Sequence, residues 1–414
     1  MFKNYLLVAF RNLFKNRIYA LINILGLGLA LAICIVAYFN YMFAFNFDRS
    51  HENFEEIYRV NSFRDMQGRD QEYGLTPLSL GKEIKNDIPG IDEVARVKRS
   101  YSPIRTDHDI FSKRVWYVDP QFMDIFTFPL IAGDKRAIKK PGNVLISQKM
   151  ANVLFGKEDP LGKQVSIFNN QNKEFVYTIA GIFKDIPMNS SFIIDVFTHI
   201  DNFLRMFNTN ETDWKAFSNG MFIRVKNADR LQQIKDLLNK YNQVQNKARP
   251  DFVITGYNLV PLKDVGDNTR EIWSNNLYPG MHPAAVIAPP IMAFLILLIA
   301  SFNFANTTIS TVGKRLKEIG LRKVLGGQRK QLMVQFLFEN ILVTLLALWV
   351  AIGLAIFLVP AYSSMWEFID MKFSFTEYLN FWIFLLLLLV ITALLAGMYP
   401  ALYISNCKEI TFTI

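Results

Sequence analysis

Four long stretches of the chain are nearly free of charged residues. They cover residues 19–45, 282–312, 332–360 and 381–404 of the 414-residue sequence. A helix needs about 20 apolar residues to cross the roughly 30 Å hydrocarbon layer of a membrane, and each stretch exceeds that length. Because soluble core helices rarely need so long an uncharged run, the pattern predicts four transmembrane helices. The first has no small-residue cleavage site at its end, so we expect an uncleaved span rather than a signal peptide.

A different pattern fills residues 46–280. Runs rich in β-branched and aromatic residues, such as EFVYTIAGIF at 174–183, alternate with runs of helical spacing, such as ADRLQQIKDLLNKY at 228–241. Gly156 and Gly162 are placed to form a turn between a helix and a strand. The predicted fold is therefore an α-helical membrane protein with four transmembrane helices plus a large α+β extracytoplasmic domain inserted between helices one and two.

The distribution of charge orients these segments. Residues 46–280 hold 32 Lys or Arg and 30 Asp or Glu, so +2 of the net charge of +9 lies there and +7 lies elsewhere. Because positive residues mark the cytoplasmic side of a membrane, we expect three cytoplasmic segments, at 1–18, 313–331 and 405–414. Residues 46–280 and the short loop 361–380 are then outside. The basic pI is a topology signal and does not indicate nucleic-acid binding.

The sequence offers little for catalysis or metal binding. It holds four histidines and two cysteines, Cys34 and Cys407, without the spacing of a metal site. The stretch from Asp107 through His108 to Asp109 is interpreted as a solvated polar loop, and no nucleophile elbow is present. We therefore predict a non-catalytic chain with no catalytic, cofactor or metal residues, and keep a membrane-anchored enzyme as a distant alternative.

Several small or polar residues interrupt the apolar stretches. Small-residue pairs four apart indicate close helix packing within the chain, the alternative being a dimer face. Polar side chains near the cytoplasmic ends of the second and third spans need partners, since unsatisfied polar groups in hydrocarbon are costly. We hypothesise that Glu339 bonds across these two spans, the alternative being a position in the headgroup layer. The residues concerned are Gly26 with Ala30, Gly28 with Ala32, then Asn303, Asn306, Thr307, Gln335 and Glu339.

The segment KRLKEIGLRKVLGGQRKQL at 314–332 carries seven Lys or Arg residues and one Glu. On a helix, Ile309, Val312, Leu316 and Ile319 fall within an arc of roughly 80°, and the charged residues face away. The helix is expected to break at Gly326 and Gly327. No phosphate loop accompanies the GGQ, so a nucleotide site is not indicated. A solvated positive loop explains the charge alone, whereas the apolar stripe and the double-glycine break indicate a short helix pressed against something at the membrane surface.

These motifs resemble those of the MacB/FtsX-type (type VII) permeases of ABC transporters. The similarity covers almost the whole chain. It is carried by AFRNLFKNRIYALINILGLGLALA, FDRSHENFEEIYRV, FMDIFTFPLIAGD, NVLISQKMANVLFGKEDPLGK, YTIAGIFKDIPMNSSF, FNFAN, KEIGLRKVLGG, QFLFEN and GMYPALYIS.

The resemblance implies a permease subunit of the bacterial inner membrane that carries a MacB-like periplasmic domain. Its partners would be a second permease subunit and a separate cytoplasmic ABC ATPase, which uses ATP and Mg, because no ATPase is fused here. A periplasmic adaptor and an outer-membrane channel are further possible partners. The predicted coupling helix comprises Lys314, Arg315, Leu316, Lys317, Glu318, Ile319, Gly320, Arg322 and Lys323.

In such permeases, closure of the ATPase drives movement of the exported domain, a mechanism called mechanotransmission, for efflux or extrusion. Alternatives of the same fold are a relay that regulates an extracytoplasmic hydrolase and a permease that extracts lipoproteins.

Overall fold

A computed structural model describes residues 11, 13–15, 17–105, 110–312, 329–373 and 379–406. The predicted polar loop at Asp107, His108 and Asp109 lies outside these residues, as does Cys407. The chain forms two compact units. Residues up to Phe45 together with those from Pro283 onward make one, here called the helical bundle. Residues Asn46–His282 make the other, here called the inserted domain.

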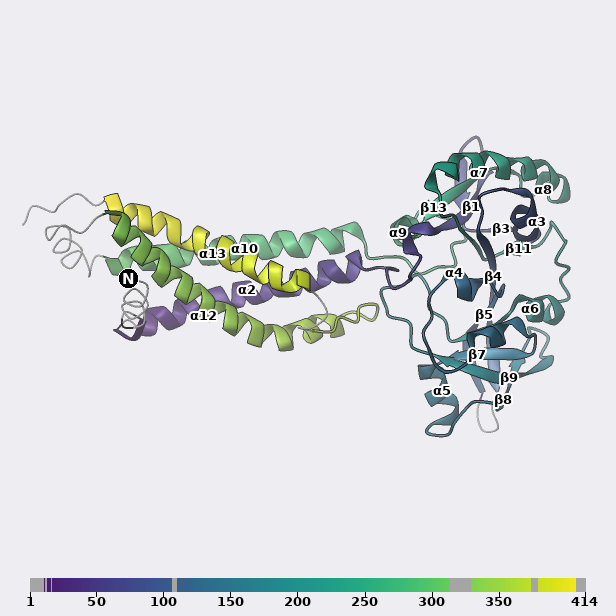
Figure 1. Cartoon of the computed structure of the whole chain (residues 1–414), viewed down its shortest axis with the longest axis horizontal. Helices are drawn as coiled ribbons and strands as arrows, with labels where there is room; N and C mark the ends of the chain where they lie inside the picture. The colour runs from purple at the N-terminus through teal and green to yellow at the C-terminus, as the bar shows by residue number, and fades with distance from the viewer. Residues whose placement is uncertain are drawn as a thin grey trace, which may run out of the picture. The chain divides into compact units, whose positions relative to one another are not determined.

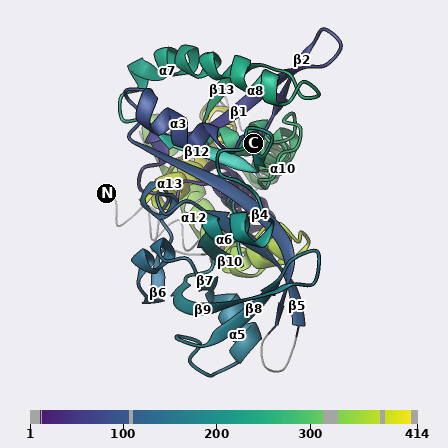
Figure 2. The same ribbon diagram turned by 90° about the vertical axis from the view of Figure 1, so that its right-hand side faces the viewer.

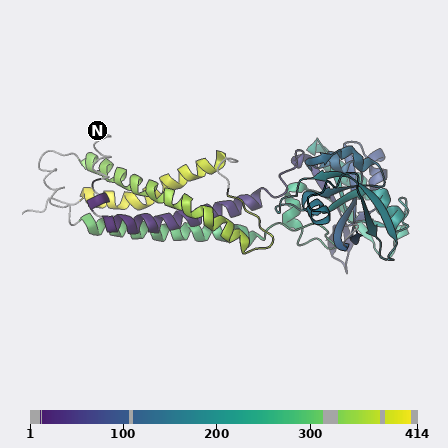
Figure 3. The ribbon, with the colours of Figure 1, turned by 90° about the horizontal axis from the view of Figure 1, so that it is seen from below.

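Four long helices form the helical bundle and run side by side (Figures 1 and 3). They are α2 (Arg17–Phe45), α10 (Pro283–Val312), α12 (Arg329–Ser364) and α13 (Leu379–Asn406). Each is long and apolar enough to cross a membrane. Their ends differ from the sequence-based boundaries by no more than four residues. The predicted arrangement of four apolar helices, with a large domain between the first and second, is confirmed.

Helices α2 and α13 each pack against both α10 and α12. Helices α10 and α12 therefore occupy opposite corners of the bundle. The outer surfaces of the helices are apolar, with Trp349 and Phe357 among the most exposed side chains. An apolar exterior is what a hydrocarbon environment requires.

One eleven-stranded sheet organises the inserted domain, with strands in the order β13-β1-β12-β4-β5-β10-β7-β9-β6, while β2 pairs with β1 and β8 pairs with β4 and β9. Strands β3 and β11 form a separate small sheet. The strands are β1 (Ile57–Asp65), β2 (Asp70–Tyr73), β3 (Thr76–Pro77), β4 (Glu93–Arg105), β5 (Ile110–Val118), β6 (Leu130–Gly133), β7 (Asn143–Ser147), β8 (Gln164–Phe168), β9 (Glu174–Phe183), β10 (Val196–His199), β11 (Phe217–Ser218), β12 (Gly220–Arg224) and β13 (Ile254–Pro261).

Short helices cover this sheet. They are α3 (Leu80–Asp87), α4 (Phe122–Ile125), α5 (Gln148–Phe155), α6 (Ile200–Met206), α7 (Leu231–Leu238), α8 (Asn242–Ala248) and α9 (Leu262–Asn268), with 3-10 turns η1 (Phe54–Glu56), η2 (Lys135–Lys139), η3 (Ala228–Arg230) and η4 (Asn239–Tyr241). The sequence explains the ends of α5. The Ser147 hydroxyl accepts from the Met150 amide (3.1 Å) at its start, and Gly156 takes φ +60° at its end.

The inserted domain has two lobes that share the long strand β4 (Figures 1 and 2). Helices α7 and α8 cover one end of the sheet, and α5 lies at the other (Figure 2). Each lobe has its own apolar core, one around Ile84, Ile223 and Ile234 and the other around Ile146 and Ile179. A third core, here called the central core, lies on the opposite face of the same strands, because its residues alternate along them with those of the two lobe cores. It is rich in aromatic rings, including Trp116, Phe122, Phe126, Phe128, Phe192, Phe197 and Phe222.

Candidate functional site

The predicted coupling segment lies outside the described residues. It comprises Lys314, Arg315, Leu316, Lys317, Glu318, Ile319, Gly320, Arg322 and Lys323, with the predicted helix break at Gly326 and Gly327. Helix α10 ends before it, at Val312, and α12 begins after it, at Arg329. Its docking role therefore stays a prediction.

Two helices of the bundle approach closely at Gly28. A Cβ atom on Gly28 would lie 3.0 Å from Val350 Cγ1 and 3.2 Å from the Ala347 carbonyl oxygen, so α2 and α12 meet here with no room for a side chain. Ala30 and Ala32 are also buried, whereas Gly26 is exposed and a Cβ atom there would meet nothing within 4 Å. Gly28 thus serves packing within the chain.

The predicted polar residues lie near the end of α10 and near the start of α12 and differ in exposure and in partners. Asn303 and Asn306 are exposed on α10. The Thr307 hydroxyl donates to the Asn303 carbonyl on its own helix (2.8 Å), and Gln335 Nε2 donates to Glu339 Oε1 one turn away on α12 (3.3 Å). These contacts lie within single helices, whereas the predicted bond from Glu339 would join α12 to α10. That pairing stays a prediction.

Sequence reasoning did not identify other polar contacts inside the bundle. Asn40, fully buried on α2, donates from Nδ2 to the Ala285 carbonyl of α10 (3.0 Å). On α12, Asn340 fills the space beside Gly397 of α13, where a Cβ atom would lie 2.6 Å from Asn340 Nδ2. Asn340 and Gly397 belong to the motifs QFLFEN and GMYPALYIS. The structure shows that these distant motifs meet.

Residues of three other motifs meet where the chain enters the inserted domain, just after α2. The motifs are FDRSHENFEEIYRV, FMDIFTFPLIAGD and YTIAGIFKDIPMNSSF. Asp48 is fully buried and takes φ +57°. Its Oδ1 accepts from the Ser190 hydroxyl (2.8 Å) and from the Ser191 amide (2.7 Å), and its own amide donates to the Asn189 carbonyl (2.9 Å). Burial raises the pKa of Asp48 to about 6, although these bonds oppose the shift.

His51 lies three residues after Asp48 and packs against the aromatic central core. Its ring makes edge contacts with Phe126, Phe128 and Phe192 at centroid distances of 5.0, 5.5 and 5.7 Å. The Thr127 amide donates to His51 Nδ1 (3.2 Å), and burial lowers the pKa of the imidazole to about 4. His51 is therefore a neutral core residue at neutral pH.

The segment that leaves the domain is fastened to the same region. The Gly280 amide donates to the Gly266 carbonyl of α9 (2.9 Å). A Cβ atom on Gly266 would lie 2.6 Å from Phe47 Cε1 and 3.4 Å from Gly280 Cα. The two ends of the inserted domain, at Phe47 and Gly280, thus lie against one glycine. We call Phe47, Asp48, His51, Gly266 and Gly280 the junction.

A buried ion network joins β4 to the loop before β11. Arg96 binds Asp119 through two nitrogens at 2.8 Å, and Arg96 Nη2 also binds Glu211 Oε1 at 2.7 Å. Burial alone would lower the pKa of Arg96, but the two carboxylates raise it. Burial alone would raise the pKa of Glu211, but Arg96 and then Lys82 lower it. The network holds the guanidinium ionised inside the domain.

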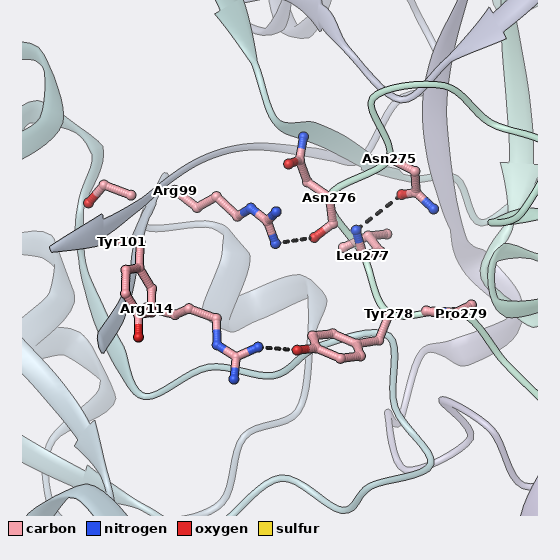
Figure 4. A pocket seen from close by; sticks show the side chains of 9 residues that line it. Arg99, Tyr101, Arg114, Asn275, Asn276, Leu277, Tyr278 and Pro279 are labelled. Atoms are coloured by element: carbon pink, nitrogen blue, oxygen red, sulfur yellow. Dashed lines mark hydrogen bonds between the residues drawn. The ribbon is translucent and has the colours of Figure 1, made fainter. Parts of the chain in front are cut away.

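The inserted domain also has an open pocket of about 480 Å³ (Figure 4). It is lined by residues 99–101 of β4, Arg114 of β5 and the loop 275–279. Arg99 Nη1 donates to the Asn276 carbonyl (2.6 Å), and Arg114 binds the Tyr278 hydroxyl. Among the residues that the structure describes, no group of three His, Cys, Asp or Glu is placed to hold a metal.

The chain matches two family models that together cover most of its length. Residues 20–241 match the MacB-like periplasmic core domain, and residues 290–407 match the FtsX-like permease C-terminal domain.

Individual relatives are similar over part of their length. The macrolide export ATP-binding/permease protein MacB of Bdellovibrio bacteriovorus is 24% identical over 63% of this chain and 38% of the relative. The uncharacterized ABC transporter permease YknZ of Bacillus subtilis is 28% identical over 51% and 47%. The chain therefore spans less than half the length of these two relatives.

The periplasmic region of MacB from Actinobacillus actinomycetemcomitans has a solved structure. Its TM-score to this chain is 0.38 at 13% identity, over 53% of this chain and 94% of that chain. The family assignment rests on the two family models, since the first alone covers more than half of the residues. The chain belongs to the MacB/FtsX-type family of ABC transporter permeases, with a MacB-like core domain inserted between the first two of four apolar helices.

Proposed function

We propose that this chain couples ATP hydrolysis by a separate cytoplasmic ATPase to movements of its inserted domain, for efflux or extrusion. It would work with a second permease subunit and bind no nucleotide itself. The Bdellovibrio relative is an ATP-binding/permease protein by name, and this chain matches fewer than half of its residues. Support for the coupling comes from the junction.

Coupling requires that a displacement of the membrane helices reach the core of the domain. Only two covalent connections join the bundle to the domain, after Phe45 and before Pro283. A connection through loose loops would absorb such a displacement. At the junction, Asp48 is instead bonded to the 189–191 segment, and His51 is packed among phenylalanines of the central core. The close packing of these side chains transmits strain.

Both connections also lie against Gly266. Phe47 on the incoming segment and Gly280 on the outgoing one contact this residue of α9, which follows β13 directly. A relative shift of the two connections would therefore strain α9 and the sheet edge beside it. This shared anchor is the observation that carries the proposal.

The first test removes the predicted docking surface. Leu316→Asp combined with Ile319→Asp should abolish both co-purification of the ATPase and its stimulation, because two charges would replace the apolar stripe. The control is Met66→Asp combined with Ile110→Asp, which places the same charges at exposed apolar positions of the inserted domain. Unchanged ATPase binding and stimulation in the first variant would contradict the coupling helix.

The second test follows transmission itself. Hydrogen exchange at residues 46–51 and 275–282 should change when the full complex is trapped with ATP and vanadate. Gly266→Ala should retain ATPase binding but lose this change, because its Cβ atom would displace Phe47. Gly220→Ala is the matched control, since its Cβ atom would meet Phe222 at an ordinary 3.5 Å. If exchange in the unmodified complex does not respond to ATP, mechanotransmission is wrong.

A further inference from the structure

The pocket at residues 99–101 combines features that the coupling proposal does not use. Strands β4 and β5 are antiparallel, and Tyr101 pairs with Arg114 while Arg99 pairs with Trp116. Paired residues point to the same face of a sheet, as do residues two apart on one strand. Arg99, Tyr101 and Arg114 therefore lie on one face, where the central core around Trp116 ends.

The two guanidinium groups give the pocket an excess of positive charge. Asp195 lies 4.0 Å from Arg114 Nε and partly balances that residue. Arg99 has no carboxylate partner among the described residues, and its guanidinium donates to the neutral Asn276 carbonyl. Burial, and then the cationic Arg114, lower the pKa of Arg99. Among the lining side chains and the carboxylate beside Arg114, two cations therefore face one anion.

Aromatic rings form the walls around these charges. Tyr101 is 69% exposed and Tyr278 is 36% exposed, although both line the pocket. The Arg114 guanidinium lies 5.4 Å from the centroid of the Tyr278 ring. Figure 4 shows both arginine side chains extending toward the 275–279 loop, with the Tyr101 ring beside Arg114. Such rings offer a flat apolar surface next to a charged hydrogen-bonding group.

The loop that closes the pocket is held in place before any ligand arrives. Asn275 Oδ1 accepts from Nη1 of the fully buried Arg59 (2.8 Å) and from the Leu277 amide (3.1 Å). The Tyr278 amide donates to the carbonyl of Ser191 (3.0 Å), whose own amide binds Asp48. A preformed wall lowers the entropy cost of binding. The same loop leads to the junction at Gly280.

We propose that this pocket binds a monoanionic carboxylate attached to an aromatic or apolar body. The planar guanidinium fork suits a carboxylate, and a monoanion matches the single excess charge. The volume of about 480 Å³ lies within the range of small-molecule sites, roughly 300–1,000 Å³. Bound there, the ligand would contact β4, β5 and the segment that continues to the junction.

The test is direct binding to the full chain in nanodiscs, measured by calorimetry without ATPase or nucleotide. N-acetylphenylalanine is the probe, and its uncharged amide and inorganic phosphate are the comparison ligands. The acid should bind, and both comparison ligands should bind at least about 10-fold more weakly, because each lacks either the charge or the ring. Binding of the acid should also weaken as salt is raised, since the pocket is open to solvent.

Variants assign the binding to the pocket. Arg99→Gln and Arg114→Gln should each weaken binding of the acid about 10- to 100-fold. Arg105→Gln is the matched control, because Arg105 lies on the same strand in an exposed pair with Glu174, outside the pocket lining. Tyr101→Ala removes an exposed side chain, so the fold should be unaffected while binding of the acid weakens about 2- to 10-fold.

Equal binding of the acid and its amide would overturn the proposal, as would equal binding of the acid and phosphate. So would unchanged binding in folded Arg99→Gln and Tyr101→Ala variants. Because no ATPase is present, failure here leaves the coupling proposal untouched, and failure of coupling leaves this binding measurement valid.

Discussion

The helical bundle and the inserted domain bury different kinds of polar side chain. In the described part of the bundle, the buried polar side chains are all neutral amides and hydroxyls: Asn23, Asn40, Ser301, Asn340, Thr344, Ser363 and Thr392. The inserted domain buries ionisable groups as well, namely Asp48, His51, Arg59, Arg96 and Asp119. The two units therefore differ in whether charged side chains are buried.

The difference follows from what surrounds each unit. In hydrocarbon an ion has no water nearby to offset its desolvation, so neutral groups that bond to backbone carbonyls are preferred. Thr344 and Thr392 do this with carbonyls four residues earlier. In the inserted domain, an ion can be compensated by an opposite charge brought from a distant strand, as Asp119 compensates Arg96. The inserted domain thus uses ion pairs between distant strands, whereas the bundle uses neutral side chains between closely packed helices.

The largest expected effect tests charge compensation in the inserted domain. Arg96→Met should destabilise the domain by about 3–5 kcal/mol, because Asp119 and Glu211 lose their shared cation while Asp119 stays buried. Urea unfolding of the full chain in detergent, followed by tryptophan fluorescence, measures the loss.

Lys226→Met is the control for this substitution. Lys226 pairs with Asp92 at 3.7 Å, but its side chain is 61% exposed whereas that of Arg96 is 6% exposed. The exposed pair should contribute less than about 1 kcal/mol. Equal losses of unfolding free energy in the two variants would mean that burial of the Arg96 ion pairs does not add to their effect. The proposed difference between buried ions in the domain and neutral groups in the bundle would then be wrong.

The next effect concerns pH, to which the buried amides and hydroxyls of the bundle should not respond. The folded-state pKa of Asp48 is raised from 3.8 to about 6, so its contribution to stability falls as pH rises from about 4 to about 6. The folded-state pKa of His51 is lowered from 6.5 to about 4, so its contribution falls as pH drops through that window. The two residues therefore oppose each other.

Substitution should separate these contributions. Between pH 6.5 and 4, Asp48→Asn should lose on the order of 3 kcal/mol more stability than the unmodified chain, since only the His51 response remains. His51→Phe should change in the opposite direction. Unfolding free energies measured across this pH range provide the check, and each variant serves as the control for the other. Profiles that match the unmodified chain in both variants would show that these groups are not buried as described.

The smallest effect tests close packing in the bundle. Gly28→Leu should destabilise it by about 1–3 kcal/mol, because the new side chain would force α2 away from Val350 and Ala347 of α12. Gly26→Leu places the same side chain two residues earlier, where a Cβ atom meets nothing within 4 Å, and should cost little. Thermal unfolding in detergent compares the two. A larger loss at Gly26 would reverse the assignment of the packing face.

Much of the architecture could be predicted from local pattern. Four helices were expected because hydrophobic length is a property of consecutive residues, and the observed helices end within four residues of those limits. The turn at Gly156 and Gly162 was also predictable, and these residues take φ +60° and +78°. Alternating strand and helix patterns indicated an α+β domain in the same way. In each case a short window of sequence contains the physical cause.

Contacts between distant segments could not be predicted in this way. Asp48 and Ser191 are 143 residues apart, and their pairing depends on how the sheet is ordered. Arg99 and Arg114 share a pocket only because of the register between β4 and β5. The expected bond from Glu339 to α10 rests on matched depth in the membrane, which is again a property of residues far apart in the sequence, and it stays a prediction.

The sequence by itself determined the number and length of the four long apolar helices and the α+β class of the inserted domain, because hydrophobic periodicity and turn residues act locally. The tertiary structure alone decided which elements are neighbours. Strand order, register and helix packing arise from burial across a whole unit. They alone bring together the residues of the junction, and likewise those of the pocket at residues 99–101.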